Sequence, residues 1–191
     1  MDNGFNGKVL VMTLNEFDSF DNNYNESMFI TRVNNIFTKL FTGIMFQNLD
    51  DIRHNISDNV YKFATNIISE NKDKNLRRMY DELNIKNTDI VSRTVSDNYF
   101  EVEVIITTRY LKYFIKLDSG DYVSGDKDNR VMEKYRLIFK KRKNTKVQKS
   151  VRYCTNCGAS IDINDSGKCR YCNTYYDSAK YDYILDKIEE V

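Results

Sequence analysis

The four cysteines of this chain are the residues whose spacing points most directly to chemistry. They form two Cys-x-x-Cys pairs, and they are Cys154, Cys157, Cys169 and Cys172. Each pair places two thiols at the tip of one tight turn, followed by Gly158 or Asn173, where a positive φ is favoured. Two such tips facing one another form a tetrahedral site of four thiolates. We therefore predict a structural Zn²⁺ site, with iron as the main competing metal and two disulfides or unrelated thiols as the alternatives without metal.

A site made only of cysteine would be closed to catalysis. Structural Zn²⁺ takes four ligands, so four thiolates leave no coordination position for water or substrate. They also leave a net negative charge, which Arg152, Lys168 and Arg170 can offset. A module of about 20 residues has almost no core of its own, so metal binding must supply its folding free energy.

A basic segment precedes the cysteines. Its cations are Lys140, Lys141, Arg142, Lys143, Lys146, Lys149 and Arg152. Phosphate attraction needs such a patch, and bases could stack on Tyr153, Tyr171, Tyr175 and Tyr176, so a nucleic-acid-binding ribbon is the alternative function. We favour a solvated hairpin that joins strand to ribbon, with anionic lipid or an acidic partner next, and we do not expect nucleic acid as the partner.

The other candidates for catalysis are weak. His54 is the only histidine, and its polar stretch suits a surface or capping role. Glu101 and Glu103 share one face of a predicted strand, where Lys134 or Arg136 of the next strand would pair with them. The sequence contains neither a P-loop nor a dinucleotide fingerprint. We therefore predict a protein that is not an enzyme.

Composition and charge set the broad class. The hydrophobic fraction of 41% is enough for a core, and the net charge of +1 gives no global field that favours nucleic acid or membrane. No apolar run approaches the roughly 18 residues of a membrane helix, and residues 1–4 lack the features of a secretory signal. We expect a cytoplasmic protein, in which disulfides are disfavoured.

Hydrophobic periodicity predicts helices first. One helix begins near Asn25, and its apolar positions, at spacings of three and four, are Phe29, Val33, Ile36, Phe37, Leu40, Phe41 and Ile44. A second helix begins at Ser57 and reaches Leu83, with an interruption near Asn71. The simplest interpretation of the first helix is that it packs in the core. The alternative is that its apolar face binds lipid or a partner helix.

Strands follow, because the period changes to two after residue 84. They are predicted over 85–95, 99–108 and 131–140, with turn signals at Ser119-Gly120 and Ser124-Gly125. Three aspartates near the turns lack EF-hand spacing, so we expect them to shape the turns: Asp118, Asp121 and Asp126. The order predicts an α+β fold, with N-terminal helices packed on a curved antiparallel sheet.

The segment from Arg152 to Cys172 resembles the zinc-ribbon tail of bacterial proteins of the Tim44-like family, whose pattern is CPNCGAP-(I/L)-D-(I/V)-N-x-(S/A)-G-x-C-x-Y-C. Thr155 and Ser160 stand where proline is common. The order of the upstream elements is also similar. The resemblance implies a cone of helices against a curved sheet, related to nuclear transport factor two, around an apolar pocket. It also implies a protein or lipid-like ligand, a part in protein transport, and no catalytic residues to carry over.

We therefore predict four parts. They are an irregular arm at 1–25, a Tim-like α+β binding domain at 26–150, a small zinc ribbon at 151–176 and a C-terminal helix at 177–191. The helix would bury Tyr181, Ile184, Leu185 and Ile188.

A ligand pocket in the binding domain would use residues that a packed core would use equally well. They are Phe37, Phe41, Phe63, Phe100, Val102, Val104, Leu137 and Phe139. The expected partner is a protein, a lipid-like ligand at a membrane surface or a second copy of the chain.

Overall fold

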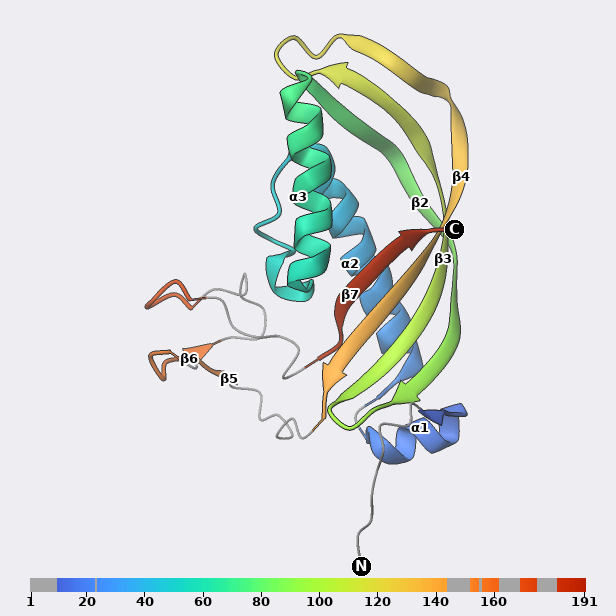
Figure 1. Ribbon diagram of the computed structural model, residues 1–191, viewed down its shortest axis with the longest axis vertical. Helices are drawn as coiled ribbons and strands as arrows, with labels where there is room; N and C mark the ends of the chain where they lie inside the picture. The colour runs from blue at the N-terminus through green and yellow to red at the C-terminus, as the bar shows by residue number, and fades with distance from the viewer. Residues whose placement is uncertain (1–9, 23, 144–151, 155, 162–168, 175–181) are drawn as a thin grey trace, which may run out of the picture.

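Three α-helices precede a strongly curved antiparallel sheet, and the long helices lie within its curve (Figure 1). The computed structural model describes residues 10–22, 24–143, 152–154, 156–161, 169–174 and 182–191. The elements are β1 (Leu10–Val11), α1 (Leu14–Phe20), α2 (Glu26–Phe46), the 3-10 helix η1 (Arg53–Asn55), α3 (Asp58–Asp73), β2 (Leu76–Val95), β3 (Tyr99–Lys116), β4 (Tyr122–Arg142), β5 (Arg152–Tyr153), β6 (Ser160–Ile161) and β7 (Ile184–Glu190). The predicted α+β class is confirmed.

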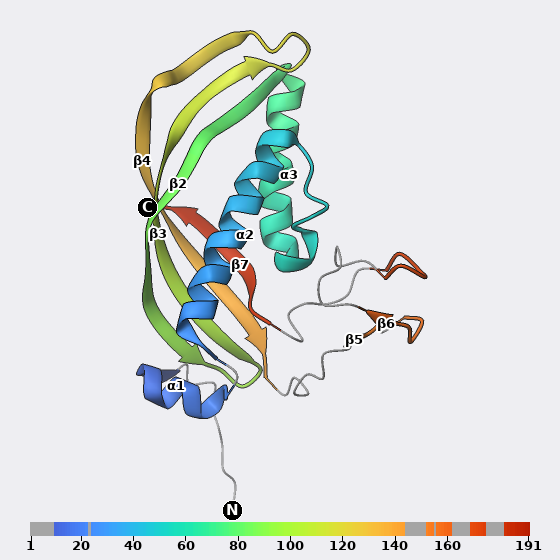
Figure 2. The same ribbon diagram turned by 180° about the vertical axis from the view of Figure 1, so that it is seen from behind.

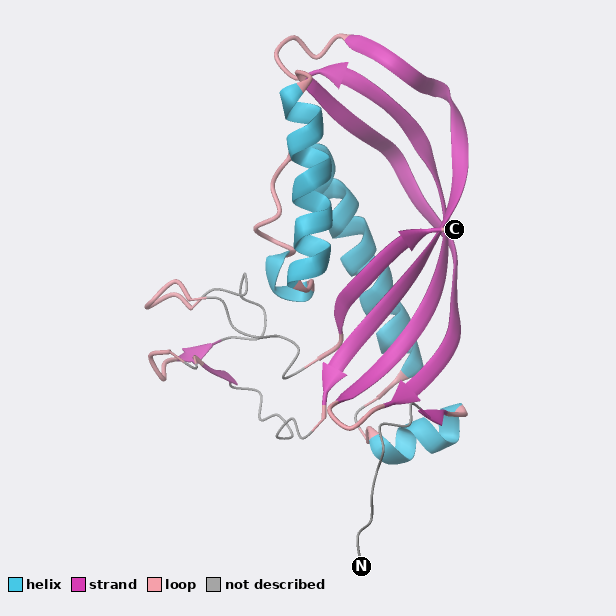
Figure 3. Ribbon diagram, viewed as in Figure 1, coloured by secondary structure: helices cyan, strands magenta, loops and turns pink. Residues whose placement is uncertain are grey.

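The main sheet has the order β1-β2-β3-β4-β7, and every neighbouring pair is antiparallel (Figure 3). Alternate residues of β3 from Phe100 to Tyr110 are buried, whereas those between them are more exposed. We call the face that carries Phe100 and Tyr110 the inner face. Helix α2 packs along it beside β2, as the view from behind shows (Figure 2).

Both long helices begin where the sequence predicts. The Asn25 side chain accepts a hydrogen bond from the Met28 backbone N–H (2.9 Å), and the Ser57 side chain caps α3 in the same way. Gly43 permits close packing near the end of α2, because a Cβ there would lie 2.8 Å from the Asn48 carbonyl oxygen. Within the described ranges, no helix is long and apolar enough to cross a membrane.

The N-terminal arm contains regular structure, contrary to the prediction of an irregular segment at 1–25. Thr13 and Glu16 form a capping box that begins α1, and Phe17 is fully buried with its ring 5.8 Å from that of Phe100. The helix has seven residues. It is too short for hydrophobic periodicity to identify.

Residues 76–83 begin β2, so the prediction that the second helix reaches Leu83 was wrong. Helix α3 ends at Asp73, and Asn75 has a φ of 55°. The pairing of β2 with β3 shifts between Asp81 and Asn84. This bulge breaks the two-residue alternation, so Tyr80 and Leu83 both contact the core at a spacing that also suits a helix.

The predicted C-terminal helix was also wrong, because residues 184–190 form the edge strand β7. Leu185 and Ile188 are both buried, although residues three positions apart point to opposite faces of a regular strand. A register shift opposite Ile138 and Phe139 brings both side chains to the inner face. The predicted turn at Ser124-Gly125 likewise lies within β4, where Gly125 has a φ of 98° and packs against the backbone of Tyr113.

The cysteine segment is an insertion between two paired strands. Strands β5 and β6 form a separate two-stranded sheet between β4 and β7 in the sequence (Figure 1). Strands β4 and β7 pair directly, with Lys140 opposite Ile184. The chain therefore leaves the main sheet and returns to it at neighbouring positions.

Candidate metal centre and ligand site

The two cysteine turns have the same backbone geometry. In the first, the Cys154 carbonyl accepts from the Gly158 N–H (2.9 Å), and the Cys154 N–H donates to the Ala159 carbonyl (2.7 Å). In the second, the Cys169 carbonyl accepts from the Asn173 N–H (2.8 Å), and the Cys169 N–H donates to the Thr174 carbonyl (3.0 Å). The two turns are thus copies of one knuckle.

A left-handed residue closes each knuckle, as the sequence predicts. Gly158 has a φ of 72° and Asn173 a φ of 57°. The Asn156 side chain of the first knuckle donates to the Thr174 hydroxyl of the second (3.2 Å), so the two turns also contact each other directly.

The four sulfurs converge on one point. The Cys154 and Cys172 sulfurs lie 3.6 Å apart, the Cys157 and Cys169 sulfurs lie 3.5 Å apart, and all four ligand atoms lie within 4.8 Å of one another. A tetrahedron with metal–sulfur bonds of about 2.3 Å has sulfur–sulfur edges of about 3.8 Å. A disulfide would need about 2.05 Å. The geometry fits a metal ion held by four thiolates, and it excludes a disulfide among these sulfurs.

The thiols cannot ionise independently at such separations. The hydrogen bond with the Thr174 side chain lowers the pKa of Cys172 to about 6. At Cys157 the Ala159 backbone N–H favours the thiolate, but the neighbouring thiols, Cys169 first, raise its pKa to about 12. A cation held between the sulfurs would favour the thiolate form, because metal ligands bind as thiolates.

Two of the four cations in the described part of the basic segment, Lys140 and Lys141, are paired with acids of the protein itself. The Lys140 ammonium pairs with Asp186 (2.8 Å) and approaches Glu101 (3.5 Å). Lys143 is half-buried, with its ammonium 5.9 Å from the Phe100 ring. Lys146, Lys149 and the side chain of Arg152 lie outside the described residues, and Arg142 is exposed.

Lys141 is a core residue rather than a surface cation, so its place in the basic patch was wrong. Its ammonium donates to both Asp21 carboxylate oxygens at 2.8 Å, and the Tyr183 hydroxyl donates to Asp21 at 2.9 Å. All three residues are at most 5% exposed. Lys141 continues the inner-face alternation of β4, which explains its burial.

The outer-face acids are paired across strands as predicted, although Glu101 pairs with Lys140 rather than with Lys134 or Arg136. Glu103 approaches Arg136 (3.4 Å), and Glu101 approaches Lys140. Asp118 accepts from the Ser119 backbone N–H (2.7 Å), in keeping with a turn-forming role. Hydrogen bonding by the Asn75 side chain and the Ser119 N–H lowers its pKa.

Seven of the eight residues predicted to line a pocket lie in the packed core. They are Phe37, Phe41, Phe100, Val102, Val104, Leu137 and Phe139. Phe63 on α3 is 39% exposed. Phe41 stacks on Phe37 (4.3 Å between ring centroids), and its ring also contacts Tyr80 and Tyr135. These tyrosines connect the apolar core to a polar region of the inner face.

Sequence reasoning missed this polar region, which we call the open cluster. It consists of Glu133, Tyr110, Tyr135, Lys112 and Arg78, all on the inner face of β2, β3 and β4. One Glu133 oxygen accepts from the Tyr110 and Tyr135 hydroxyls, and the other accepts from the Lys112 ammonium (2.6 Å). Glu133 and Lys112 remain 14% and 30% exposed at their side chains.

The hydrogen bonds fix the charge states of the open cluster. Burial raises the pKa of Tyr110 and Tyr135 far above the ordinary value, and the hydrogen bonds to Glu133 raise both further. Burial also opposes ionisation of Glu133, but bonds from Lys112 and the two hydroxyls outweigh it and lower its pKa. Glu133 is therefore a carboxylate and both phenols are neutral at pH 7.

One sequence signal pointed to this cluster. Val131, Tyr135, Leu137 and Phe139 form the predicted apolar face of β4, and Glu133 occupies the same face. An acidic side chain on a strand face that points to the core needs hydrogen-bond or ion-pair partners. Arg78 gave no signal, because its segment was interpreted as helix.

Comparison with known proteins supports one assignment. The family model described as "Tim44-like domain" matches residues 11–150. The matched range includes α1 through β4 and ends before the cysteine segment and β7. A search of curated proteins finds none that matches the chain.

Proposed function

The chain belongs to the Tim44-like domain family, and from this premise we propose that it is a non-catalytic binding module held together in part by a structural zinc ion. The ligand would be a protein or a lipid-like molecule received on the inner face of the sheet. The Tim44-like domain suggests a binding module of this kind.

The observation that carries the proposal is the closed set of four sulfurs. Four thiolates fill a tetrahedral site, so a metal there has no position for substrate and acts on structure alone. Zinc suits four thiolates and carries no redox chemistry, whereas iron in the same geometry would give an electron-transfer centre. With the metal committed to structure, the Tim44-like domain is the part that can recognise a ligand.

The inner face supports binding better than catalysis. A general base works best with a pKa near the operating pH, whereas the pKa of Glu133 is lowered and those of its tyrosine partners are raised. The groups of the open cluster therefore keep their charges and hydrogen bonds at neutral pH, which suits binding rather than proton transfer. The nucleic-acid alternative loses support, because Lys140 and Lys141 are paired within the protein.

Native mass spectrometry with elemental analysis tests the proposal. We expect one zinc ion per chain and, where a ligand co-purifies, a second mass that denaturation releases. The Cys172→Ser variant should lose the metal, whereas Thr155→Ser, which leaves every thiol in place, should keep it. A freshly prepared wild-type chain without a tightly held metal would sink the structural-zinc proposal.

Chelation provides a second test. Metal removal should abolish amide-exchange protection at Cys154 and Cys169, because their bonds exist only in the folded knuckles. Protection in β7 should persist, because Leu185 is fully buried in the main core. Unfolding of β7 together with the knuckles would contradict the separation of the two parts.

A further inference from the structure

Arg78 places a guanidinium beside the aromatic side chains of the inner face. It is half-buried on the inner face, between Leu76 and Tyr80 on the same side of β2. Its guanidinium carbon lies 5.3 Å from the Phe114 ring centroid. Tyr80 is 5% exposed, so this part of the face borders the core.

The polar contacts of Arg78 are few. Among the described residues its side chain makes no ion pair, and the one hydrogen bond of the guanidinium is a long one to the Tyr80 hydroxyl (3.4 Å). Its Nε atom is buried without a partner in the same part of the chain. A guanidinium offers five donors in a planar fork, and leaving a buried charge unsatisfied is costly. Such an arrangement calls for an anion.

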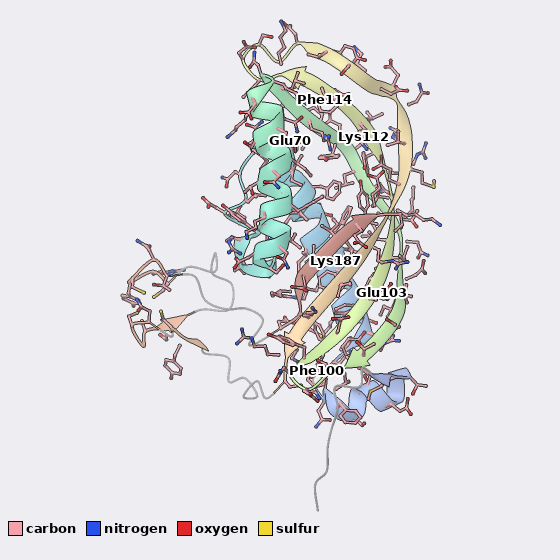
Figure 4. The ribbon with its side chains drawn as sticks, in the orientation of Figure 1. Glu70, Phe100, Glu103, Lys112, Phe114 and Lys187 are labelled. Carbon is pink, nitrogen blue, oxygen red and sulfur yellow. The ribbon has the colours of Figure 1, made fainter. Side chains whose placement is uncertain are left out.

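A second cation lies beside Arg78. In the pairing of β2 with β3, Tyr80 is opposite Lys112 and Arg78 is opposite Phe114. Arg78 and Lys112 are therefore diagonal neighbours on one face, with Cβ atoms about 7 Å apart. Figure 4 shows Lys112 and Phe114 on the part of β3 opposite the end of α3 that carries Glu70.

The charge balance within the open cluster favours an anion. Glu133 takes one of the three donors of Lys112, and that side chain is 30% exposed, which leaves donors available. Arg78, Lys112 and Glu133 together carry one net positive charge.

We propose that Arg78 and Lys112 form a binding site for an oxyanion, the carboxylate or phosphate group of the ligand. This deepens the proposed function by naming the chemistry that the inner face recognises. The Arg78 fork would bind two oxygens of the group, and Lys112 would add a point charge from the neighbouring strand. Tyr80 and Phe114 would cover its sides.

Thermal unfolding of the full chain tests the site, with inorganic phosphate and acetate as probes and chloride at equal ionic strength as reference. At about ten times its dissociation constant, the preferred anion should raise Tm by roughly 3–5 °C over chloride. Arg78→Gln should remove this rise. Arg77→Gln should retain it, because Arg77 is the next residue, faces the outer side and also has a buried, unpartnered Nε.

The Arg77→Gln control also distinguishes anion binding at the site from a general salt effect. Phosphate stabilises many proteins by exclusion from their surface, and such a rise would be equal in both variants. Equal rises in Arg78→Gln and Arg77→Gln, or no rise in the wild type, would overturn the proposal. A rise with phosphate alone or with acetate alone identifies the group.

If circular dichroism shows that Arg78→Gln does not fold, Arg78→Lys serves instead. It keeps the charge and loses the fork, so most of the rise should disappear. A full rise in that variant would contradict bidentate binding. The metal content of the chain is independent of these outcomes, so the site can fail while the structural-zinc proposal stands.

Discussion

Two polar clusters lie on the inner face of the same sheet, and they differ in exposure. The sealed cluster consists of Asp21, Lys141 and Tyr183, each at most 5% exposed. The open cluster has the same kinds of group, a carboxylate, a lysine and tyrosines, but Lys112 is 30% exposed and Arg78 has no ion pair among the described residues.

The sealed cluster connects three parts of the chain. Asp21 caps the end of α1, Lys141 lies near the end of β4, and Tyr183 precedes β7. The Asp21 carboxylate receives donors from both partners, so little capacity is left for a ligand. The buried charges of the sealed cluster are matched by one another, which makes it a structural connection, whereas the open cluster keeps donors on Arg78 and Lys112 for the proposed anion.

The largest expected effect comes from breaking the sealed cluster. Lys141→Met should lower the free energy of unfolding by about 3–5 kcal/mol, because it removes the ammonium that faces the buried Asp21 carboxylate. Urea denaturation measures this. Lys140→Met is the control on the outer face and should cost less than about 1 kcal/mol. Similar losses in both variants would contradict the distinction between a sealed pair and a surface pair.

A smaller loss is expected in the open cluster. Glu133→Gln keeps the shape of the side chain but weakens three hydrogen bonds, so it should cost about 1–3 kcal/mol. The cost stays below that of Lys141→Met because water can reach Lys112. Glu101→Gln, on the outer face, provides the comparison by the same urea assay, and an equal loss there would argue against a special role for Glu133.

The open cluster should make the stability of the protein depend on pH in both the acid and the alkaline range. The pKa of Glu133 is lowered from 4.5, so its contribution is present above pH 4.5 and is lost as pH falls through the lower folded-state pKa. The pKa values of Tyr110 and Tyr135 are raised from 10.0, so their contribution is present below pH 10 and is lost as pH rises further. Unfolding measured from pH 3 to 11 should therefore show an acid limb that Glu133→Gln reduces. An unchanged acid limb in that variant would refute this assignment.

The smallest effect is expected at Arg78 in the absence of an anion. Arg78→Gln should change the free energy of unfolding by less than about 0.5 kcal/mol, or stabilise slightly, because the guanidinium has so few partners. Chemical denaturation in a buffer free of phosphate and carboxylate is the appropriate measurement. A loss of several kcal/mol would place Arg78 with the structural residues of the sealed cluster.

The sequence predicted those features that depend on local signals. Asn25 and Ser57 mark helix starts because capping depends on residues close in the sequence. The spacing of the cysteines predicts the metal site, because each knuckle is local and the two need only face each other. Both strands that were predicted as helix lie where a bulge changes the alternation, at Asp81 in β2 and opposite Ile138 of β4 in β7. A bulge depends on pairing with a distant strand, so the local pattern there is compatible with a helix.

The polar clusters show a second limit of sequence reasoning. Lys141 and Glu133 occupy core-facing positions of β4, which the alternation reveals, but their partners come from α1, β3 and the segment before β7. The pattern indicates that a charge is turned inward. Only the assembled fold shows whether it is neutralised there or left for a ligand.

The cysteine segment is inserted between β4 and β7, so this edge of the sheet is a position where one inserted module could be replaced by another. Lys140 and Ile184 pair across one ladder, where neighbouring strands lie about 5 Å apart. A module whose ends lie that close can replace another with little change in the entropy of closing the connection. The edge strand would stay docked through its buried Leu185, so this position of the chain should accept a different inserted module by design.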